Sequence, residues 1–178
     1  SNTTEIIYSH EYGVNTAIQD STGALWFTQS TQNKNEERLF VAIAKPISDG
    51  SLFRLPLLDN GYFAEKPELI LDELDFANGF YINETNQKFY LSETLANRVL
   101  SYDLDVTTGS LKNMTILAEI PSPDNMQLNH DGSLWVASPL SNQIFSVDIT
   151  NGNSFVVFDA QTKNGAAIVA EGISRVSR

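Results

Sequence analysis

The chain contains no cysteine, only two histidines and few basic residues. Without cysteine it forms no disulfide and offers no thiolate nucleophile or zinc–sulfur site. Its 11 Lys and Arg residues stand against 22 Asp and Glu residues, a net charge of −11. Because phosphate binding needs clustered basic side chains, we expect no nucleic-acid partner.

The chain also lacks a long apolar run. A membrane-spanning helix needs about 18 or more consecutive apolar residues, which no segment provides, so we expect no membrane span. The first residues show no basic region followed by an apolar run, so no signal peptide is visible in the sequence. Secreted proteins need not contain disulfides, so the absence of cysteine assigns no compartment.

The residues that are present suffice for a packed core. The apolar fraction is 42%, and 178 residues correspond to one domain or to one piece of a larger domain. Two histidines cannot build a histidine-rich metal site. Numerous Asn, Asp and Glu side chains are compatible with an oxygen-ligand site for a hard cation such as calcium.

An internal repeat is the main positive signal. Residues 15–27 match residues 124–136 without a gap, and their turn glycines and Leu-Trp pairs coincide. A further copy begins at Asn78 and needs one extra turn residue. Residues 95–103 match residues 140–148 at an offset of 45, also without a gap.

The repeated unit predicts an all-β fold. Short apolar segments rich in Ile, Val, Phe and Tyr alternate with polar turns, and no stretch shows a convincing helical period. Four strands in roughly 45 residues is the spacing of a β-propeller blade of four antiparallel strands. We therefore expect residues 1–178 to form a partial β-propeller of about three blades. Its predicted segments are three repeats at about 5–67, 68–113 and 114–160, an insertion at 30–50 and a tail at 161–178.

The number of repeats is too small for a closed ring. A propeller closes with at least four blades, whereas the chain holds about three repeats and flanking strands at 5–8 and 154–158. An isolated partial ring would expose strand edges and an apolar blade face. We therefore expect a piece of a longer propeller, with a second chain or a companion fragment closing the ring. The alternative is a half-propeller that dimerises about a two-fold axis.

The repeat places three polar residues at equivalent positions where each blade begins. They are Asn15, Asn78 and Asp124, and Asn125 follows directly. The first strand of a blade lines the central channel, so these residues should converge near the axis. Two amides and a carboxylate are oxygen donors suited to calcium. Alternatively, they are loop residues that cap backbone groups.

Other candidates favour structural roles. Trp26, Tyr90 and Trp135 share one repeat position, which favours packing between blades over a ligand-binding stripe. We interpret His10 as a surface or loop residue rather than a proton carrier, and His130 as a solvated turn residue. Glu93 and Glu119 have no visible partner and are interpreted as surface residues. Ser92 and Ser138 end equivalent strands, but no base or elbow motif activates either of them. The insertion either covers a site or is a loop without a role.

The sequence resembles the calcium-dependent six-bladed propeller superfamily that includes SMP-30/gluconolactonase, paraoxonase/arylesterase and strictosidine synthase-like proteins. The resemblance covers about residues 5–158. It is carried by Phe76-Ala77-Asn78-Gly79, by residues 89–99, by Pro123-Asp124-Asn125 leading to residues 134–137, and by residues 20–28.

The resemblance implies a central calcium ion held by Asn15, Asn78 and Asp124, with Asn125 as a further ligand as in paraoxonases. The family's remaining ligand, a glutamate, belongs to a blade that has no match here, so calcium binding should be weak or absent unless that glutamate is supplied. A paraoxonase-like catalytic histidine pair also belongs to the missing region, which leaves the catalytic residues unknown. The implied function is calcium-dependent hydrolysis of a small-molecule lactone or ester, with the metal as Lewis acid. The alternatives are a non-catalytic binding scaffold and a strictosidine synthase-like protein without metal-dependent hydrolysis.

Overall fold

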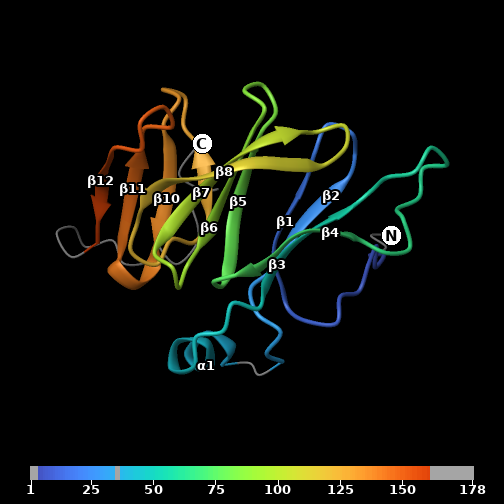
Figure 1. Cartoon of the computed structure of the whole chain (residues 1–178), viewed down its shortest axis with the longest axis horizontal. Helices are drawn as coiled ribbons and strands as arrows, with labels where there is room; N and C mark the ends of the chain where they lie inside the picture. Colours follow the sequence, from blue (N-terminus) through green and yellow to red (C-terminus); the bar gives the residue numbers. More distant parts are fainter. Residues whose placement is uncertain (1–3, 35–36, 161–178) are drawn as a thin grey trace.

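The computed structural model describes residues 4–34 and 37–160, and the regular secondary structure in this part of the chain is almost entirely β-strand. Its strands form three four-stranded antiparallel sheets, with orders β1-β2-β3-β4, β5-β6-β7-β8 and β12-β11-β10-β9 (Figure 1). Each sheet is therefore a meander of consecutive strands, which is the blade of a β-propeller. The predicted all-β fold with about three blades is confirmed.

The strands are short and each sheet occupies one continuous stretch of chain. Their bounds are β1 Val14–Gln19, β2 Leu25–Gln29, β3 Gly50–Leu55, β4 Glu68–Leu74, β5 Ala77–Asn83, β6 Lys88–Glu93, β7 Arg98–Asp105, β8 Ser110–Glu119, β9 Met126–Leu128, β10 Leu134–Ser138, β11 Gln143–Val147 and β12 Ser154–Asp159. The 3-10 helix η1 spans Pro139–Ser141.

The flanking strands predicted from the sequence have different outcomes. Residues 154–158 lie within β12, as expected. The strand predicted at residues 5–8 is wrong, because these residues adopt no strand conformation. An outermost strand needs the third strand of its own sheet as a hydrogen-bonding partner. The described residues provide no such strand beside residues 5–8.

The insertion lies between the second and third strands of the first sheet, as predicted. It follows β2 and contains helix α1 (Arg38–Ala44), which the sequence analysis did not anticipate. Figure 1 shows α1 beyond one end of the sheets. No helix in the described residues is long and apolar enough to cross a membrane. The predicted tail at 161–178 lies outside the described residues.

The core lies between neighbouring sheets, because alternate residues of each strand point to opposite faces. Trp26 is fully buried and packs on Phe89 of the second sheet, with ring centroids 5.3 Å apart. On the other face of the second sheet, Tyr90 packs with Leu134 and Val136 of the third. Trp135 is half-buried on the far side of the third sheet. At the repeat position shared by Trp26, Tyr90 and Trp135, the first two residues therefore pack between sheets, as predicted.

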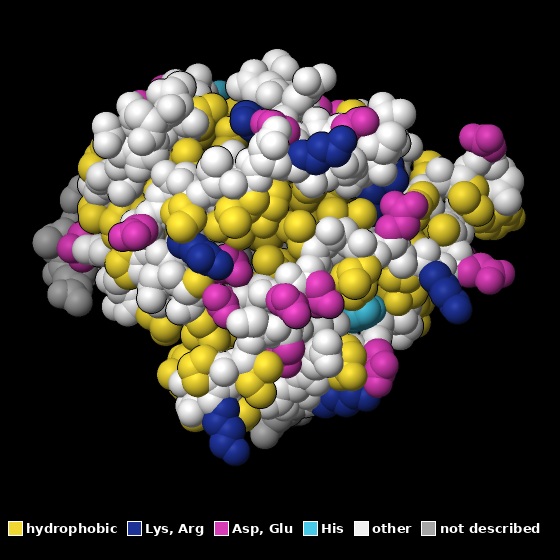
Figure 2. All heavy atoms as spheres, in the orientation of Figure 1, with side chains coloured by type: hydrophobic (Ala, Val, Ile, Leu, Met, Phe, Trp, Pro, Cys, Tyr) yellow, Lys and Arg dark blue, Asp and Glu magenta, His cyan; other side chains and the backbone are white. Residues whose placement is uncertain are grey.

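The surface carries both charged and apolar side chains. Large apolar residues are exposed on outer strands, among them Leu69 of β4, Met114 of β8 and Phe155 of β12. Figure 2 shows yellow apolar side chains across the middle of the visible face, with basic side chains scattered among acidic ones.

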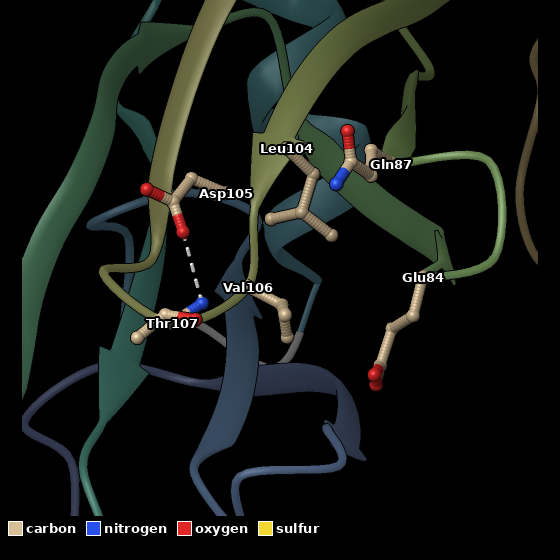
Figure 3. Close-up of a pocket in the computed structure, with 6 residues that line it drawn as sticks. All are labelled: Glu84, Gln87, Leu104, Asp105, Val106 and Thr107. Atoms are coloured by element: carbon tan, nitrogen blue, oxygen red, sulfur yellow. Dashed lines mark hydrogen bonds between the residues drawn. The ribbon is translucent and has the colours of Figure 1, made fainter.

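A pocket of about 340 Å³ lies at the end of the second sheet where β5 ends and β6 begins (Figure 3). It is lined by Glu84, Gln87 and residues 104–107. Both carboxylates already accept hydrogen bonds from backbone amides. Glu84 accepts from the Ser21 N–H at 2.7 Å, and Asp105 accepts from the Thr107 N–H at 3.1 Å. Hydrogen bonds from Thr108 hold the pKa of Asp105 below its usual value.

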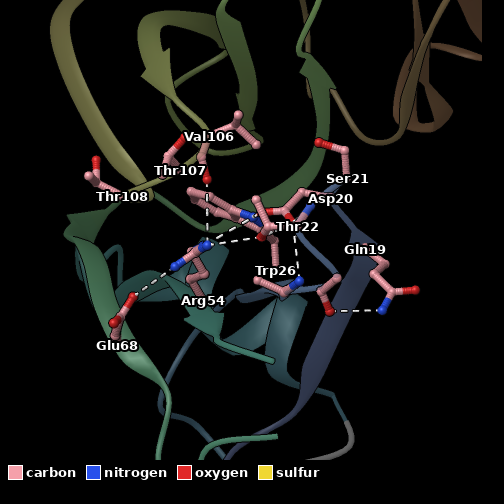
Figure 4. Close-up of polar contacts among 12 residues, drawn as sticks. Gln19, Asp20, Ser21, Thr22, Trp26, Arg54, Glu68, Val106, Thr107 and Thr108 are labelled. Carbon is pink, nitrogen blue, oxygen red and sulfur yellow. Dashed lines mark hydrogen bonds and ion pairs between the residues drawn. The ribbon is translucent and has the colours of Figure 1, made fainter. Parts of the chain in front are cut away.

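A buried ion pair of the first sheet lies at this same end and contacts the second sheet through Arg54 (Figure 4). The Asp20 carboxylate accepts from the Ala24 N–H at 3.1 Å and from Trp26 Nε1 at 2.7 Å. Arg54 Nε lies 3.6 Å from Asp20 Oδ2, and Arg54 Nη2 donates to the carbonyl of Val106 in the second sheet. Arg54 therefore links the turn of the first hairpin to the turn after β7.

Replacing Asp20 with alanine should lower the free energy of unfolding by about 3–5 kcal/mol, because it removes the buried counter-ion of Arg54 and leaves only the half-exposed Glu68. The exposed turn residue Asp131 is the matched control, since its carboxylate accepts from Ser133 and Asn129 within its own turn. Asp131→Ala should cost only about 0.5–1.5 kcal/mol. Urea unfolding of the two variants measures the difference, and equal losses would show that the Asp20–Arg54 pair adds nothing beyond a turn hydrogen bond.

Candidate metal centre

The candidate ligands lie where the innermost strands of the three sheets begin. Asn15 and Asn78 are the second residues of β1 and β5, and Asp124 and Asn125 directly precede β9. These starts lie at the end of the sheets opposite the Asp20–Arg54 pair and the 340 Å³ pocket, because β1 and β5 run from one end to the other.

Each of these strand starts is irregular. The β1–β2 register shifts between Val14 and Ala17, and the β5–β6 register shifts between Ala77 and Phe80. In the third sheet, Asp124 N–H donates to the Ala137 carbonyl, and Ala137 N–H donates to the Asn125 carbonyl. Bulges of this kind redirect side chains and are frequent beside functional sites.

Direct contacts bring the starts of neighbouring strands together. A Cβ atom on Gly79 would lie 2.5 Å from Asn125 Cα and 2.6 Å from the Asp124 carbonyl oxygen, so only glycine fits there. Thr16 Oγ1 donates to Asn125 Oδ1 at 3.1 Å and lies 3.3 Å from Asn15 Oδ1. The four predicted residues therefore belong to one neighbourhood.

A shared hydroxyl connects the first two sheets at this point. Thr28 is fully buried, and its Oγ1 accepts from Thr16 N–H at 3.2 Å and donates to the Asn78 carbonyl at 2.8 Å. The Asn15 side chain, which is exposed, donates from Nδ2 to Ser30 Oγ at 2.9 Å. Hydroxyl groups of β2 and of the residue after it thus support both asparagines.

Asn78 has an unusual environment. Its side chain is 6% exposed, and its Nδ2 donates to Thr94 Oγ1 at 3.0 Å. Its Oδ1 is buried and has no hydrogen-bond partner. A buried polar atom without a partner costs free energy, so such atoms are rare and point to a ligand or to bound water.

Asp124 is the acidic member of the group. Burial raises the pKa of its carboxyl above the ordinary value, and hydrogen bonding from Asn78 offsets part of that increase. The half-buried carboxylate and the Asn78 side-chain amide are therefore neighbours. A hard cation would stabilise both the carboxylate and the unpartnered amide oxygen. In the described residues no three His, Cys, Asp or Glu side chains form a metal-binding group, so any site here depends on amide oxygens.

One of the remaining sequence interpretations needs correction. Glu93 is not a surface residue: it is 1% exposed, accepts from Arg98 Nε at 2.5 Å and accepts from Asp75 N–H at 2.8 Å. The signal was available, because Glu93 and Arg98 flank a tight hairpin and pair across it. His10 lies in a loop, as predicted, but is half-buried rather than on the surface.

His10 packs on the free face of the first sheet. Its ring centroid lies 5.2 Å from that of Phe27 and 4.9 Å from that of Phe53. Its Nε2 lies 2.9 Å from Oε1 of Gln29, and its Nδ1 lies 3.2 Å from the Tyr8 hydroxyl. The segment before β1 therefore covers an apolar face that would otherwise be bare.

The other interpretations agree with the structure. His130 and Glu119 are exposed. The Ser92 hydroxyl is buried without a hydrogen-bond partner, and the Ser138 hydroxyl contacts the Pro121 carbonyl and Ser141. Neither serine contacts a base, so neither is an activated nucleophile.

Sequence reasoning missed the hydroxyl residues that support the candidate ligands. These are Thr16, Thr28, Ser30 and Thr94. Ser30 and Thr94 each directly follow the second strand of their sheet, so the repeat alignment could have revealed them. Nothing in the sequence reveals that Thr28 bridges two sheets, because its partners lie 12 and 50 residues away.

The fold and this group of oxygen donors define a partial β-propeller with a candidate metal centre. The SMP-30/gluconolactonase/LRE-like family matches residues 5–172, and the chain belongs to this family. Regucalcin from Oryctolagus cuniculus is 28% identical over 85 residues, which are 46% of this chain and 28% of that protein. Protein strictosidine synthase-like 13 from Arabidopsis thaliana is 24% identical over 116 residues, which are 65% of this chain and 27% of that protein.

Solved structures show the same fold. A luciferin-regenerating enzyme matches with a TM-score of 0.63 and 23% identity, over 81% of this chain and 46% of that one. A gluconolactonase from Xanthomonas campestris matches with a TM-score of 0.60 and 22% identity, over 82% and 46%. A calcium-binding protein, regucalcin, from Agrobacterium tumefaciens matches with a TM-score of 0.60 and 18% identity, over 80% and 43%. The match thus spans less than half of each of these propellers.

Gly79→Ala should lower the free energy of unfolding by about 1–3 kcal/mol, because the added methyl group forces the backbones of β5 and the residues before β9 apart. Gly132→Ala is the control: its turn also loses a glycine, at φ +85°, but a Cβ there meets nothing within 4 Å. Thermal unfolding of both variants tests the prediction. A smaller loss for Gly79→Ala than for Gly132→Ala would contradict the close packing of the strand starts.

Asp124→Asn should stabilise the calcium-free protein at neutral pH. Because the pKa of Asp124 is raised on folding, the folded state binds a proton more tightly than the unfolded chain does. Wild-type stability therefore falls as the pH rises from 3.8 through the raised value. Urea unfolding with a chelator should show the variant more stable at pH about 7, with a difference that shrinks as the pH falls through that window. A less stable variant at neutral pH would contradict it.

Proposed function

We propose that this chain forms part of a calcium-dependent hydrolase of lactones or esters. The observation that carries the proposal is the buried, unpartnered Oδ1 of Asn78, in a residue whose amide also neighbours the half-buried Asp124 carboxylate, where the starts of three inner strands meet. Oxygen donors in this setting suit calcium better than a soft or nitrogen-preferring metal. The proposed ligands are Asn15, Asn78 and Asp124, with Asn125 as a further one.

A bound calcium ion would act as a Lewis acid that polarises a substrate carbonyl. The chain's own residues hold it and orient its ligands: Asp124 supplies charge, Asn78 supplies a desolvated oxygen, and Thr16 ties Asn125 to the first sheet. A single carboxylate gives little ligand charge, so affinity should be low in this chain alone. We propose that the rest of the ring, from a longer protein, a second chain or a companion fragment, adds a glutamate ligand and the catalytic base.

The substrate class follows from the family and from the named gluconolactonase neighbour. A lactone or ester carries the carbonyl oxygen that such a cation polarises, and neither needs a basic binding surface. Among the described serines, Ser92 and Ser138 lack a base, which favours attack by water over a serine nucleophile.

Calcium should raise the melting temperature of the wild-type chain, because it binds the folded state alone. Asn78→Ala and Asp124→Ala should each abolish this increase, whereas His130→Ala, an exposed turn residue, should keep it. Native mass spectrometry with calcium identifies the metal-bound species and shows whether it is the 19.7 kDa chain or a pair of chains.

Hydrolysis is tested on the complete propeller, in which the longer protein, a second chain or a companion fragment closes the ring. Lactone or aryl-ester turnover that chelator removes and calcium restores would support the proposal. Calcium binding without turnover would favour a non-catalytic scaffold instead. Turnover that is insensitive to chelator would overturn the metal-dependent reaction.

A further inference from the structure

The two ends of the Asn78 side-chain amide are chemically different. Only the oxygen can bind a cation, whereas the NH₂ group can only donate hydrogen bonds. Rotation of the amide by half a turn would therefore present the wrong end to the candidate site. The site therefore depends on the contact that determines the orientation of the Asn78 amide.

Thr94 determines it through the direction of its own hydrogen bonds. A threonine hydroxyl has one proton, and Thr94 Oγ1 donates it to the Pro123 carbonyl at 2.8 Å. With that proton committed, the hydroxyl can only accept from Asn78. The group that faces it at 3.0 Å must be Nδ2, which leaves Oδ1 on the other side.

Burial strengthens the preference for this orientation of the Asn78 amide. Thr94 is 5% exposed and Asn78 is 6% exposed, so solvent does not readily replace either hydrogen bond. Turning the amide over would place Oδ1 against a hydroxyl oxygen that has no proton to give. It would also leave the NH₂ group where Oδ1 now has no partner. Asp124 also accepts from the Asn78 amide, but it is itself a proposed ligand, so Thr94 is the acceptor outside the ligand set.

The first sheet repeats the arrangement. Asn15 Nδ2 donates to Ser30 Oγ at 2.9 Å, and Ser30 is 1% exposed. Ser30 follows Gln29, which pairs with Val14, just as Thr94 follows Glu93, which pairs with Ala77. A hydroxyl directly after the second strand thus binds the amide nitrogen of the asparagine in both blades.

We propose that Thr94 is a positioning residue, which orients the Asn78 amide so that its oxygen faces the cation site, and that Ser30 does the same for Asn15. The proposal rests on the calcium function proposed above. Thr94 touches no substrate and no cation, and it acts through Asn78 and Pro123.

The test compares Thr94→Val, which keeps the shape and removes the hydroxyl, with Thr94→Ser, which keeps the hydroxyl. Thr28→Val is the matched control for the exchange measurement alone, because its buried hydroxyl binds the backbone carbonyl of Asn78 rather than its amide. Two quantities are measured on the full chain: calcium affinity by titration calorimetry, and solvent exchange of the Asn78 side-chain NH₂ protons by NMR. The NH₂ signals are identified by their loss in Asn78→Ala.

In the wild type, Thr94→Ser and Thr28→Val, the Asn78 NH₂ proton that Thr94 accepts should be protected from exchange. In Thr94→Val that protection should be lost, and calcium should bind about 10–100-fold more weakly, as is usual when a partner of a metal ligand is removed. If Thr94→Val does not fold, Ser30→Ala and Asn15 provide the same comparison in the first sheet.

The outcomes separate this inference from the proposed function. Unchanged NH₂ protection in Thr94→Val, or unchanged calcium affinity after its loss, would overturn the positioning role. No calcium binding by the wild type, with NH₂ protection that still depends on the Thr94 hydroxyl, would overturn the calcium site in this chain while supporting Thr94 as the residue that orients Asn78.

Discussion

The close approach of the strand starts at Gly79 is the constraint on which the candidate site depends. There the backbone of β5 lies against the backbone of Asp124 and Asn125, with no room for a side chain on Gly79. Such proximity removes water from Asn78 and from Asp124. The nearby hydroxyl groups then form specific hydrogen bonds with these residues, because a buried donor or acceptor must find its partner within the protein. The Thr28 and Thr94 contacts follow from this loss of solvent.

The two ends of the sheets use polar groups for different purposes. At the hairpin end, Asp20 and Arg54 are paired, and their surroundings engage most of their hydrogen-bonding capacity. That arrangement stabilises the contact between sheets and leaves no anionic oxygen for a ligand. At the opposite end, the hydrogen bond from Asn78 offsets only part of the cost of removing the half-buried Asp124 carboxylate from water, and Asn78 Oδ1 has no hydrogen-bond partner. Buried oxygen atoms without enough hydrogen bonds lower the stability of the fold, but they remain available as ligands for a cation.

The chain belongs to the SMP-30/gluconolactonase/LRE-like family, and this membership bears on the difference between the two ends of the sheets. The chain spans less than half of the solved propellers it matches. The proposed site contains a single carboxylate, so the proposal assigns its remaining charge to the rest of the ring. The covering of Phe27 and Phe53 by Tyr8 and His10 shows that the free face of the first sheet is partly protected from solvent in this chain.

The sequence alone determined the all-β fold, the number of sheets and the packing role of Trp26 and Tyr90, because strand periodicity and repeat spacing are local patterns. It also placed Asn15, Asn78 and Asp124 at equivalent positions. Only the tertiary structure decided that Glu93 is a buried partner of Arg98, that residues 5–8 form no strand, and that Thr94 orients Asn78. These outcomes depend on contacts between strands and on access to water, and a residue's burial is set by neighbours that its own segment does not specify.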